Sequence, residues 1–424
     1  MGMNIALKNI AASFLLMVLL SSCGGGGSST TPPAGNQPPP TTVVAKGDRI
    51  MEIDLTLPAD EDFISAFNKG RDVGMESISV SLDWTVIEVG LNQNTNPPTP
   101  IYETDPANDF LAIINGCYPP SNMKATLTLR PVITLVKNTP PDLENLPLDD
   151  PAVIARFKQL IDHVISKLPD LDLAALVIGS EVDLYLQTDT LKAEYLNFYE
   201  QISDYARTQY TAAYPNKSPI KIAVESTFEG LSDASSKAYF QQLNQFSDVI
   251  GVSYYPMDGN GQARPVSTVE TDFQSLIASY PDKQLYFFQL GYPSGYYSAD
   301  YYPEVRAGMA SAQIGSSDIQ QADFISAVFT AWDKHINAIG FIDFTWLHDL
   351  SEADVAATTI DPAFGGTANP DPKFVEFLRT VGLRTNDGAN STDANGSDKM
   401  AYTRLKTEAQ KRSWPVSQTP FSCN

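Results

Sequence analysis

The chain of 424 residues is long enough for one large domain with additional segments, and a hydrophobic content of 43% can build a substantial core. Its 50 acidic residues against 28 basic ones give a formal net charge of -22. Such a surface repels phosphate backbones, and no run of Lys and Arg compensates for it, so we do not expect a nucleic-acid partner.

The N-terminus has the parts of a signal peptide. Lys8 precedes an apolar run from Ile10 to Leu20 that is too short to span a bilayer, and small residues follow. The sequence Leu20-Ser21-Ser22-Cys23 resembles a lipobox, the cleavage signature of bacterial lipoproteins. The resemblance implies a signal peptide over residues 1–22 and a lipidated Cys23 that anchors the exported protein in a membrane, at the outer membrane, periplasm or cell surface.

Residues 23–47 lack the composition of a folded domain. Gly24 to Gly27 is followed by Ser, Thr and Pro residues through Thr42. Such a segment cannot bury a core and is typical of a flexible tether. It therefore favours the lipid anchor over an ordinary secretory signal whose cleavage site happens to lie near a cysteine.

From Asp48 onward, short apolar or β-branched runs alternate with segments of helical periodicity, which predicts parallel strands joined by helices. Eight strands are expected, at Arg49–Leu55, Ser77–Leu82, Ala125–Leu129, Ala174–Gly179, Ile220–Glu225, Val249–Tyr254, Gln284–Gln289 and Ile339–Phe344. The clearest helix begins after Asp150, a good N-cap, with Pro151 at the first helical position. Another carries Phe324, Val328 and Trp332 at helical spacing.

Eight such units favour an α/β fold of the closed (β/α)₈ TIM-barrel type over residues 48–383. The alternative is an open doubly wound sheet, which usually carries a glycine-rich loop after its first strand. The sequence Ile53-Asp54-Leu55-Thr56-Leu57-Pro58 contains no glycine, which favours the barrel. We also expect a long loop insertion from Val89 to Met123 and a C-terminal tail, residues 384–424, with a last helix at about 399–411.

Two cysteines remain besides the predicted lipidation site. Thiols can pair in an oxidising compartment, and a bond between Cys117 and Cys423 would pin the tail to the loop after the second strand. The three histidines are scattered and match no zinc-ligand spacing. We therefore expect neither a metal nor a cofactor.

In a (β/α)₈ barrel the reactive residues lie at the carboxyl ends of the strands. The predicted ends are rich in aromatic, acidic and amide side chains: Asp83-Trp84, Arg130-Pro131, Ser180-Glu181, Glu225-Ser226, Tyr254-Tyr255, Gln289 to Tyr292, and Trp346. Aromatic faces suit the apolar faces of sugar rings, while sugar hydroxyls need carboxylates, amides and arginine. These ends are typical of a carbohydrate cleft, so we expect an oligo- or polysaccharide partner.

Four of these motifs, in the same order, resemble the retaining (β/α)₈ glycoside hydrolases. Val177-Ile178-Gly179-Ser180-Glu181 is similar to the G-N-E that closes their fourth strand. Gln289-Leu290-Gly291-Tyr292-Pro293-Ser294 is similar to the E-x-G-[WY]-P-S that closes the seventh strand in family 17 β-glucanases and family 53 galactanases. Tyr254-Tyr255-Pro256 and Trp346 resemble the endings of strands six and eight.

The resemblance implies a role for each matching residue. Glu181 corresponds to the acid/base, which protonates the leaving oxygen and then activates water. Trp346 would form the floor of the cleft, and one of Tyr254 and Tyr255 would hydrogen-bond the residue on strand seven. Further substrate contacts are expected from Ser180, Tyr292, Arg130, which could orient a carboxylate, and Trp84, which could equally be a core residue.

Two residues depart from the family pattern. Gln289 stands where the family has its nucleophilic glutamate, and a neutral amide can neither form a normal glycosyl ester nor stabilise an oxocarbenium ion by charge. Ser180 replaces the asparagine that contacts the sugar 2-hydroxyl. Glu225, at the end of the fifth strand, is the best substitute carboxylate, although a structural ion pair is an equal alternative.

Three functions follow from these residues. The first is an enzyme acting on a β-linked glycan, with Glu181 as the acid and Glu225, or the substrate itself, replacing the nucleophile. The second is a catalytically inactive, carbohydrate-binding barrel, a pseudoenzyme, and the third is a structural envelope protein. Asp343 and His348 are left outside the site, because we expect Asp343 to point outward and His348 to lie at the surface.

Overall fold

The computed structural model describes residues 42–55, 61–296, 314–367, 369–386, 396–416, 421 and 423. The predicted signal peptide, Cys23 and most of the predicted tether lie outside these residues. None of the helices in the described ranges combines the length and the apolar character that a membrane span requires.

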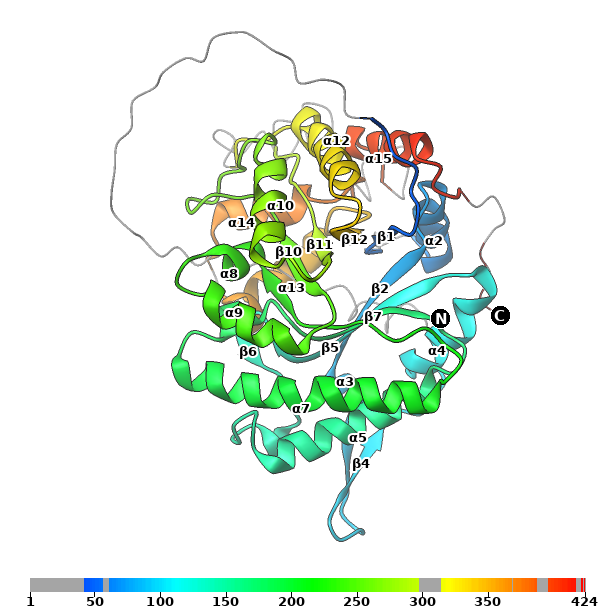
Figure 1. Ribbon diagram of the computed structural model, residues 1–424, viewed down its shortest axis with the longest axis vertical. Helices are drawn as coiled ribbons and strands as arrows, with labels where there is room; N and C mark the ends of the chain where they lie inside the picture. The colour runs from blue at the N-terminus through cyan, green and yellow to red at the C-terminus, as the bar shows by residue number, and fades with distance from the viewer. Residues whose placement is uncertain are drawn as a thin grey trace.

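Eight parallel strands close into a barrel, one of them in two pieces, and helices surround it (Figure 1). In order around the ring they are β1 (Ile50–Ile53), β2 (Ser77–Asp83), β5 (Lys124–Ile133), β7 (Leu173–Ser180), β8 with β9 (Ile222–Ala223 and Glu225–Thr227), β10 (Ile250–Tyr254), β11 (Leu285–Leu290) and β12 (Ile339–Phe344). Pairing of β12 with β1 closes the first and last units. The predicted barrel and its eight strands are confirmed.

The fifth strand is interrupted at Val224. Before the break β8 pairs with β7, and after it β9 pairs with β10, so the two short pieces together complete the ring. The carbonyl oxygen of Val224 approaches Gly251 so closely that a Cβ added there would lie 2.4 Å from it. Glycine at position 251 therefore permits the backbone contact on which ring closure depends.

The helices that follow the strands cover the outside of the ring. The cap predicted for α5 (Pro151–Lys167) is present, because the Asp150 side chain accepts a hydrogen bond from the N–H of Ala152. The apolar stripe predicted around Trp332 is buried on α12 (Asp318–Lys334). The other long helices are α2 (Phe63–Asp72), α7 (Asp189–Ala213), α9 (Lys237–Leu243) and α10 (Thr268–Ser279). Shorter elements are α3 (Trp84–Ile87), α6 (Val182–Tyr185), α8 (Phe228–Ser232), β6 (Val136–Lys137), η2 (Pro119–Ser121), η3 (Pro141–Leu143) and η4 (Asn244–Phe246).

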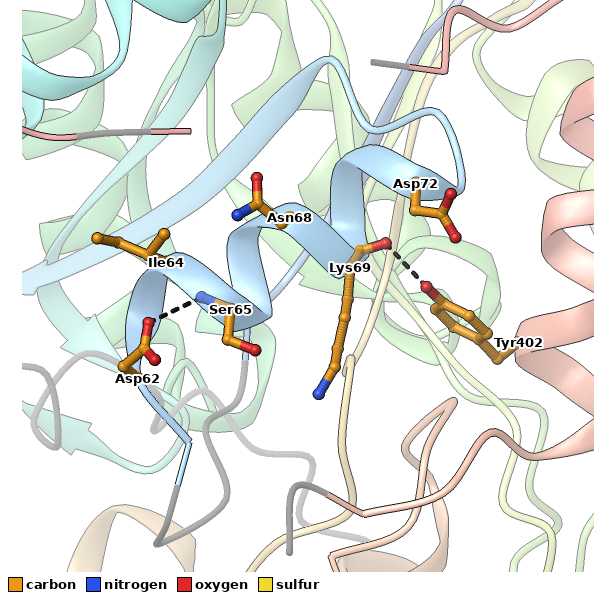
Figure 2. A pocket seen from close by; sticks show the side chains of 7 residues that line it. All are labelled: Asp62, Ile64, Ser65, Asn68, Lys69, Asp72 and Tyr402. Atoms are coloured by element: carbon orange, nitrogen blue, oxygen red, sulfur yellow. Dashed lines mark hydrogen bonds between the residues drawn. The ribbon is translucent and has the colours of Figure 1, made fainter. Parts of the chain in front are cut away.

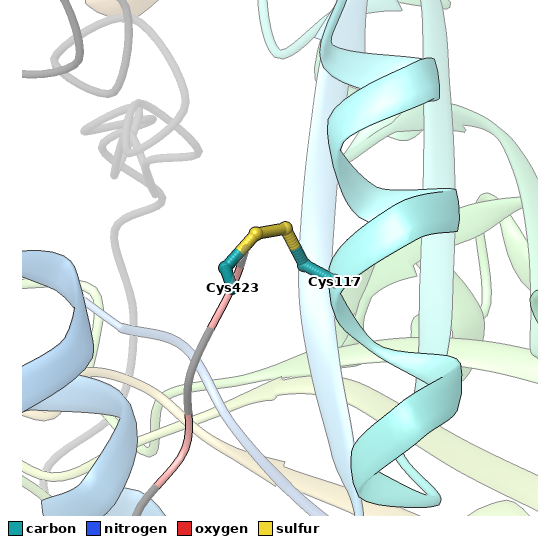
Figure 3. The surroundings of a disulfide bond; sticks show 2 residues. All are labelled: Cys117 and Cys423. Atoms are coloured by element: carbon teal, nitrogen blue, oxygen red, sulfur yellow. A yellow bond between two sulfur atoms is a disulfide. The ribbon is translucent and has the colours of Figure 1, made fainter.

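The predicted insertion after the second strand is present and contains regular structure. An antiparallel hairpin of β3 (Glu88–Asn92) and β4 (Thr99–Tyr102) projects from the barrel (Figure 1), and α4 (Phe110–Cys117) follows it. The expected pairing of Cys117 with Cys423 is confirmed, with Cα atoms 4.8 Å apart (Figure 3). The bond holds the last described residue of the chain against α4.

Two segments after the eighth strand complete the fold. The predicted last helix is α15 (Met400–Lys411), which lies beside α12 and buries Tyr402 and Leu405. Before it, α13 (Glu352–Ile360), η5 (Pro362–Phe364) and α14 (Pro372–Thr380) pack over the carboxyl ends of several barrel strands. Where these elements meet the ends of the strands, they form a second hydrophobic cluster, which we call the cap cluster. Its members include Ile133, Tyr255, Trp346, Leu350, Val355, Phe377 and Leu378.

Candidate active site

The alternation of side chains along the strands divides the barrel interior into two layers. The lower layer is apolar and consists of Ile50, Ala174, Ala175, Val177, Ala223, Val249, Tyr286, Phe288 and Phe341. On β1, steps of two residues from Ile50 place Glu52 and Asp54 above it. The upper layer, toward the carboxyl ends of the strands, contains five acids: Glu52, Asp54, Glu181, Glu225 and Asp343.

Glu181 follows β7 directly and adopts a left-handed backbone conformation, with a φ of 48°. Ser253 Oγ donates to its Oε1 at 2.7 Å, and Thr134 Oγ1 lies 3.5 Å from its Oε2. Complete burial, reinforced by the nearby negative charge of Glu225, raises the pKa of Glu181 well above its ordinary value. This shift favours the protonated form of Glu181, which is the state that a general acid needs.

Glu225 begins β9, on the strand next to Glu181. Its Oε2 accepts a hydrogen bond from Ser180 Oγ at 2.7 Å. Burial raises the pKa of Glu225 to about 7, against the opposing effects of Ser180, Gln289 and the positive charge of Arg130. Among the described residues no cation forms an ion pair with Glu225 within 4.0 Å. Burial thus raises the pKa values of both neighbouring carboxyl groups.

Gln289 reaches the same interior because β11 is irregular. Its register against β10 shifts at Ser253, which pairs with Gln289, and such a bulge turns a side chain toward the other face of a strand. Tyr255 Oη donates to Gln289 Oε1 at 3.0 Å, and the Gln289 side chain also hydrogen-bonds Glu225. Because Oε1 accepts from the tyrosine, the amide N–H group is left as the donor to Glu225.

Arg130 brings positive charge to the upper layer. Its Nε lies 2.8 Å from Asp83 Oδ1, and its side chain is almost fully buried. Loss of solvent raises the pKa of Asp54 to about 7, although a hydrogen bond from Trp346 and the charge of Arg130 oppose this. Arg130 therefore pairs with Asp83 and lowers the pKa values of Asp54 and Glu225 through its charge.

Of the three tyrosines predicted to line the site, only one reaches it. Tyr255 makes the hydrogen bond to strand seven that the resemblance assigns to one of the pair. Tyr254 points to the opposite face, as strand alternation requires, and donates to Asp272 at 2.7 Å. Tyr292 donates to the backbone oxygen of Arg264 at 3.0 Å. The structure thus brings Tyr255 to the site but neither Tyr254 nor Tyr292.

The two predicted tryptophans also differ. Trp84 belongs to the main core, packs edge-on against Phe157 with ring centroids 4.9 Å apart, and donates its indole N–H to Glu88. Its position is that of a core residue. Trp346 follows a cis peptide bond, lies fully buried in the cap cluster and favours the ionised form of Asp54. It is therefore next to the acids, but covered.

Sequence analysis missed three acids of the upper layer. The expectation that Asp343 points outward is wrong, because Asp343 is fully buried and is the register partner of Glu52 on β1. Asp343 would point outward if the alternation of β12 continued to Trp346 and Trp346 faced the cleft. Instead, β12 ends at Phe344. An available signal was the two-residue step from Ile50 to Glu52 to Asp54, which places acids on the same face as an inward apolar residue.

The expectation that His348 lies at the surface is wrong, because its side chain is fully buried. Its Nε2 lies 3.2 Å from Glu61 Oε2 and 3.1 Å from Arg384 Nε. The adjacent Asp349 forms an ion pair with Lys399 Nζ at 2.6 Å. These contacts connect residues far apart in the chain, which no local pattern could reveal. They hold the C-terminal segment on the barrel.

A shallow groove on α2, shown in Figure 2, is lined by Asp62, Ile64, Ser65, Asn68, Lys69, Asp72 and Tyr402, and none of the upper-layer acids borders it. Within the described ranges, no group of three or more His, Cys, Asp and Glu side chains could hold a metal ion.

No protein-family model matches the sequence, and no curated protein matches it either. Solved structures share its fold. An exo-β-1,4-mannosidase from Opitutaceae bacterium strain TAV5 is 10% identical with a TM-score of 0.58, and the match covers 87% of this chain and 60% of the mannosidase. A GH5_18 variant from Streptomyces cattleya in complex with Manβ1-4GlcNAc is 14% identical with a TM-score of 0.55, covering 88% and 82%. The GH53 catalytic domain of Ignisphaera aggregans is 16% identical with a TM-score of 0.50, covering 87% and 99%.

The first of these proteins is longer, and the chain spans 60% of its length. At such low identities the likeness concerns the fold, and it agrees with the closed ring of strands described above. The predicted resemblance is thereby confirmed at this level: the chain has the (β/α)₈-barrel fold of the glycoside hydrolases.

Proposed function

We propose that this protein is a glycoside hydrolase that cleaves a β-linked glycan, with Glu181 as the general acid and Glu225 as its carboxylate partner. The observation that carries the proposal is a pair of buried carboxyl groups on neighbouring strands whose pKa values are both raised by burial, that of Glu225 to about 7. The structural neighbours include a β-1,4-mannosidase and a protein bound to Manβ1-4GlcNAc, which supports a β-linked substrate.

In this mechanism the proton of Glu181 passes to the glycosidic oxygen as the bond to the anomeric carbon breaks. Ionised Glu225 stabilises the positive charge that develops on the sugar and accepts a proton from the water whose oxygen bonds to the anomeric carbon in place of the leaving oxygen. Gln289 serves as a positioning residue, because its amide donates to Glu225 while Tyr255 fixes its oxygen. A neutral amide cannot form the glycosyl ester of the usual retaining mechanism.

The proposal requires the cap cluster to shift when a glycan binds. Glu181 and Trp346 are fully buried, and Glu225 and Gln289 nearly so. Phe377 on α14 packs edge-on against Tyr255 with ring centroids 5.2 Å apart, and Tyr255 in turn donates to Gln289. Displacement of α14 would uncover Trp346, whose ring could then stack on a sugar as the resemblance implies.

The decisive experiment is a hydrolysis assay with aryl β-glycosides and β-linked mannan, glucan, galactan and xylan. Glu181→Gln should lower kcat/KM by about 10²–10⁴-fold, the usual contribution of a general acid. Glu352→Gln is the matched control, because Glu352 is an exposed glutamate paired with Arg379 on the cap, and it should retain activity. Glycan binding without turnover by the unaltered protein would instead identify a catalytically inactive carbohydrate-binding barrel.

We also propose that the protein is exported and anchored through a lipid on Cys23. Support comes from the lipobox-like sequence and from the disulfide between Cys117 and Cys423, since such bonds persist in oxidising compartments. Cells grown with an alkyne-tagged fatty acid should label the protein, and Cys23→Ser should abolish the label. Cys117→Ser should keep it. Equal labelling of both variants would contradict the anchor.

A further inference from the structure

The turn that carries Glu181 has an unusual backbone conformation. Gly179 and Glu181 both have a positive φ, of 84° and 48°, so two residues near the end of β7 are left-handed. A Cβ at Gly179 would lie 2.6 Å from Cγ1 of Val182, which shows how tightly the turn packs on itself. Glu181 has a Cβ and adopts the left-handed region at a cost, so other contacts must hold the turn in place.

Asp183 on α6 connects this turn to β9. Its Oδ1 accepts a hydrogen bond from the N–H of Thr227 at 2.8 Å, and its Oδ2 accepts from Thr227 Oγ1 at 2.6 Å. We call these two hydrogen bonds the clamp. A Cβ at Gly230 would lie 2.5 Å from Cγ of Asp183, so the carboxyl group packs directly on the start of α8.

The clamp is connected to both proposed catalytic acids. Thr227 lies two residues after Glu225 on β9, and its register partner on β10 is Ser253. Ser253 Oγ donates to Oε1 of Glu181 at 2.7 Å. The chain from Glu181 to Asp183, the clamp, the strand pairing and this hydrogen bond form a closed series of contacts. The series joins the turn that carries Glu181 to the strand that carries Glu225.

We propose that Asp183 is a positioning residue, which holds the Glu181 turn on β9 and thereby sets the position of Glu181 relative to Glu225. The inference rests on the proposed function, in which both acids act on one glycosidic bond. A displacement of about 1 Å between such groups can lower a rate about 10²-fold. The charge of Asp183 adds to the effect of burial in raising the pKa of both acids, as expected of a neighbouring carboxylate.

Variants of Thr227 test the clamp without changing any charge. Thr227→Val removes the hydroxyl group, and Thr227→Ser keeps it. Thr227→Val should lower kcat per folded molecule by about 10–10²-fold with a much smaller change in KM, because the clamp positions the acids and does not touch the glycan. Thr227→Ser should retain most of the kcat. Asp233→Asn is the control, since Asp233 is an exposed acid at the end of α8, and it should retain activity.

A double variant separates the clamp from the capping of α8. Thr227 Oγ1 also accepts from the N–H of Gly230 at 3.0 Å, so Thr227→Val removes this cap together with part of the clamp. Asp183→Ala removes the clamp and leaves the cap. It should lower kcat per folded molecule at least as much as Thr227→Val does. Adding Thr227→Val to Asp183→Ala should then lower kcat little further, because both changes break the same contact.

Hydrogen exchange tests the clamp without any substrate. Within the turn, the N–H of Leu184 donates to the backbone oxygen of Glu181 at 3.1 Å. In the full chain, the peptide that covers residues 178–186 should exchange several-fold faster in Asp183→Ala and Thr227→Val than in the unaltered protein, as measured by mass spectrometry. Thr227→Ser should resemble the unaltered protein. The peptide that covers α5 should be the same in all variants.

Three results would overturn the inference. The first is an unchanged kcat per folded molecule in Asp183→Ala, and the second is a Thr227→Ser variant as slow as Thr227→Val. The third is a pair of losses that multiply in the double variant. An unaltered protein without hydrolytic activity would instead count against the proposed function. In that case, unchanged exchange of residues 178–186 in Asp183→Ala would still contradict the clamp.

Discussion

Two groups of acids in this molecule are buried, one paired with basic side chains and the other surrounded mainly by further acids. Between α12 and the C-terminal segment, Asp333 accepts from Arg49 at 2.9 Å and from Arg412 at 2.9 Å, and at the other end of α15 Asp349 is paired with Lys399. Inside the barrel, acids such as Asp343 mainly face one another.

The difference shows what burial does with and without a cation. A paired buried carboxylate fixes two parts of the chain together, because breaking the pair would leave an isolated charge. Buried acids that lack such a pair have their pKa values raised by the loss of solvent and, for Asp343, by neighbouring negative charges as well, so that Asp54 and Glu225 titrate near neutral pH. The first group is structural, and the second has the chemistry on which the proposed function depends.

The largest effect on stability is expected in the paired group. Asp333→Ala leaves the guanidinium groups of Arg49 and Arg412 buried without their common partner. The free energy of unfolding should fall by about 3–5 kcal/mol, as measured by denaturant titration. Asp323→Ala is the control, because Asp323 lies on the same helix, is largely exposed and forms only a weak pair with Arg404. Equal losses in both variants would contradict the structural role assigned to the buried, paired acids.

The disulfide is the covalent counterpart of these ion pairs. Replacing Cys117 and Cys423 together by serine should lower the free energy of unfolding by about 2–5 kcal/mol, because the unfolded chain gains freedom. Reduction of the unaltered protein should reproduce this loss. Hydrolysis per folded molecule should remain unchanged, since the bond joins the tail to α4 and not to the acids. A loss of activity without a loss of stability would contradict this separation.

The barrel acids predict a pH dependence of stability. The folded-state pKa values of Glu52, about 8, and of Asp54 and Glu225, about 7, are raised above their ordinary values. The folded state therefore binds more protons than the unfolded state. Their contribution to stability is fully present below about pH 4 and is lost as the pH rises through 7 to 8.

Denaturant titrations at pH 5, 7 and 9 would measure this loss. One unit of pKa shift corresponds to about 1.4 kcal/mol, so the decrease should be at least of that order. In Glu52→Gln the decrease between pH 5 and pH 9 should be smaller, because glutamine cannot ionise. Stability that instead increases over this range would show that the acids are ionised in the folded protein.

The smallest effect is expected at position 289. Gln289→Glu places another acid beside Glu225, which should raise the pKa of both groups and move the acidic limb of hydrolysis upward. We expect kcat/KM at its optimum to change less than about tenfold, since Glu225 already supplies the carboxylate. A much larger gain in hydrolysis would mean that position 289 is still the nucleophile position and that Glu225 is not its substitute.

Most of the fold follows from local patterns. The strand and helix periodicities predicted the eight strands, the start of α5 at Asp150 and the last helix, because each depends on neighbouring residues. The cap cluster could not be predicted in this way. It forms where Trp346 meets Phe377 and Tyr255, and these contacts depend on how distant loops fold over the barrel.

The site shows the same limit. Strand ends identified Glu181, Glu225 and Gln289, because the carboxyl ends of barrel strands meet at one face. Which of Tyr254 and Tyr255 points inward depends on where β10 ends, and this is uncertain by one residue in a sequence. Asp343 was misplaced for the same reason, since a single irregular step reverses the face of every following side chain.

The most direct test of the account is the pH dependence of kcat/KM for the unaltered protein and for Glu225→Gln. The proposed mechanism requires Glu225 to be ionised and Glu181 to be protonated, so activity should rise through about pH 7 as Glu225 ionises and fall when Glu181 loses its proton. In Glu225→Gln the rise near pH 7 should disappear together with most of the activity. A limb near pH 4.5, the ordinary value for a glutamate, or a limb near pH 7 that persists in Glu225→Gln, would contradict the proposed pair.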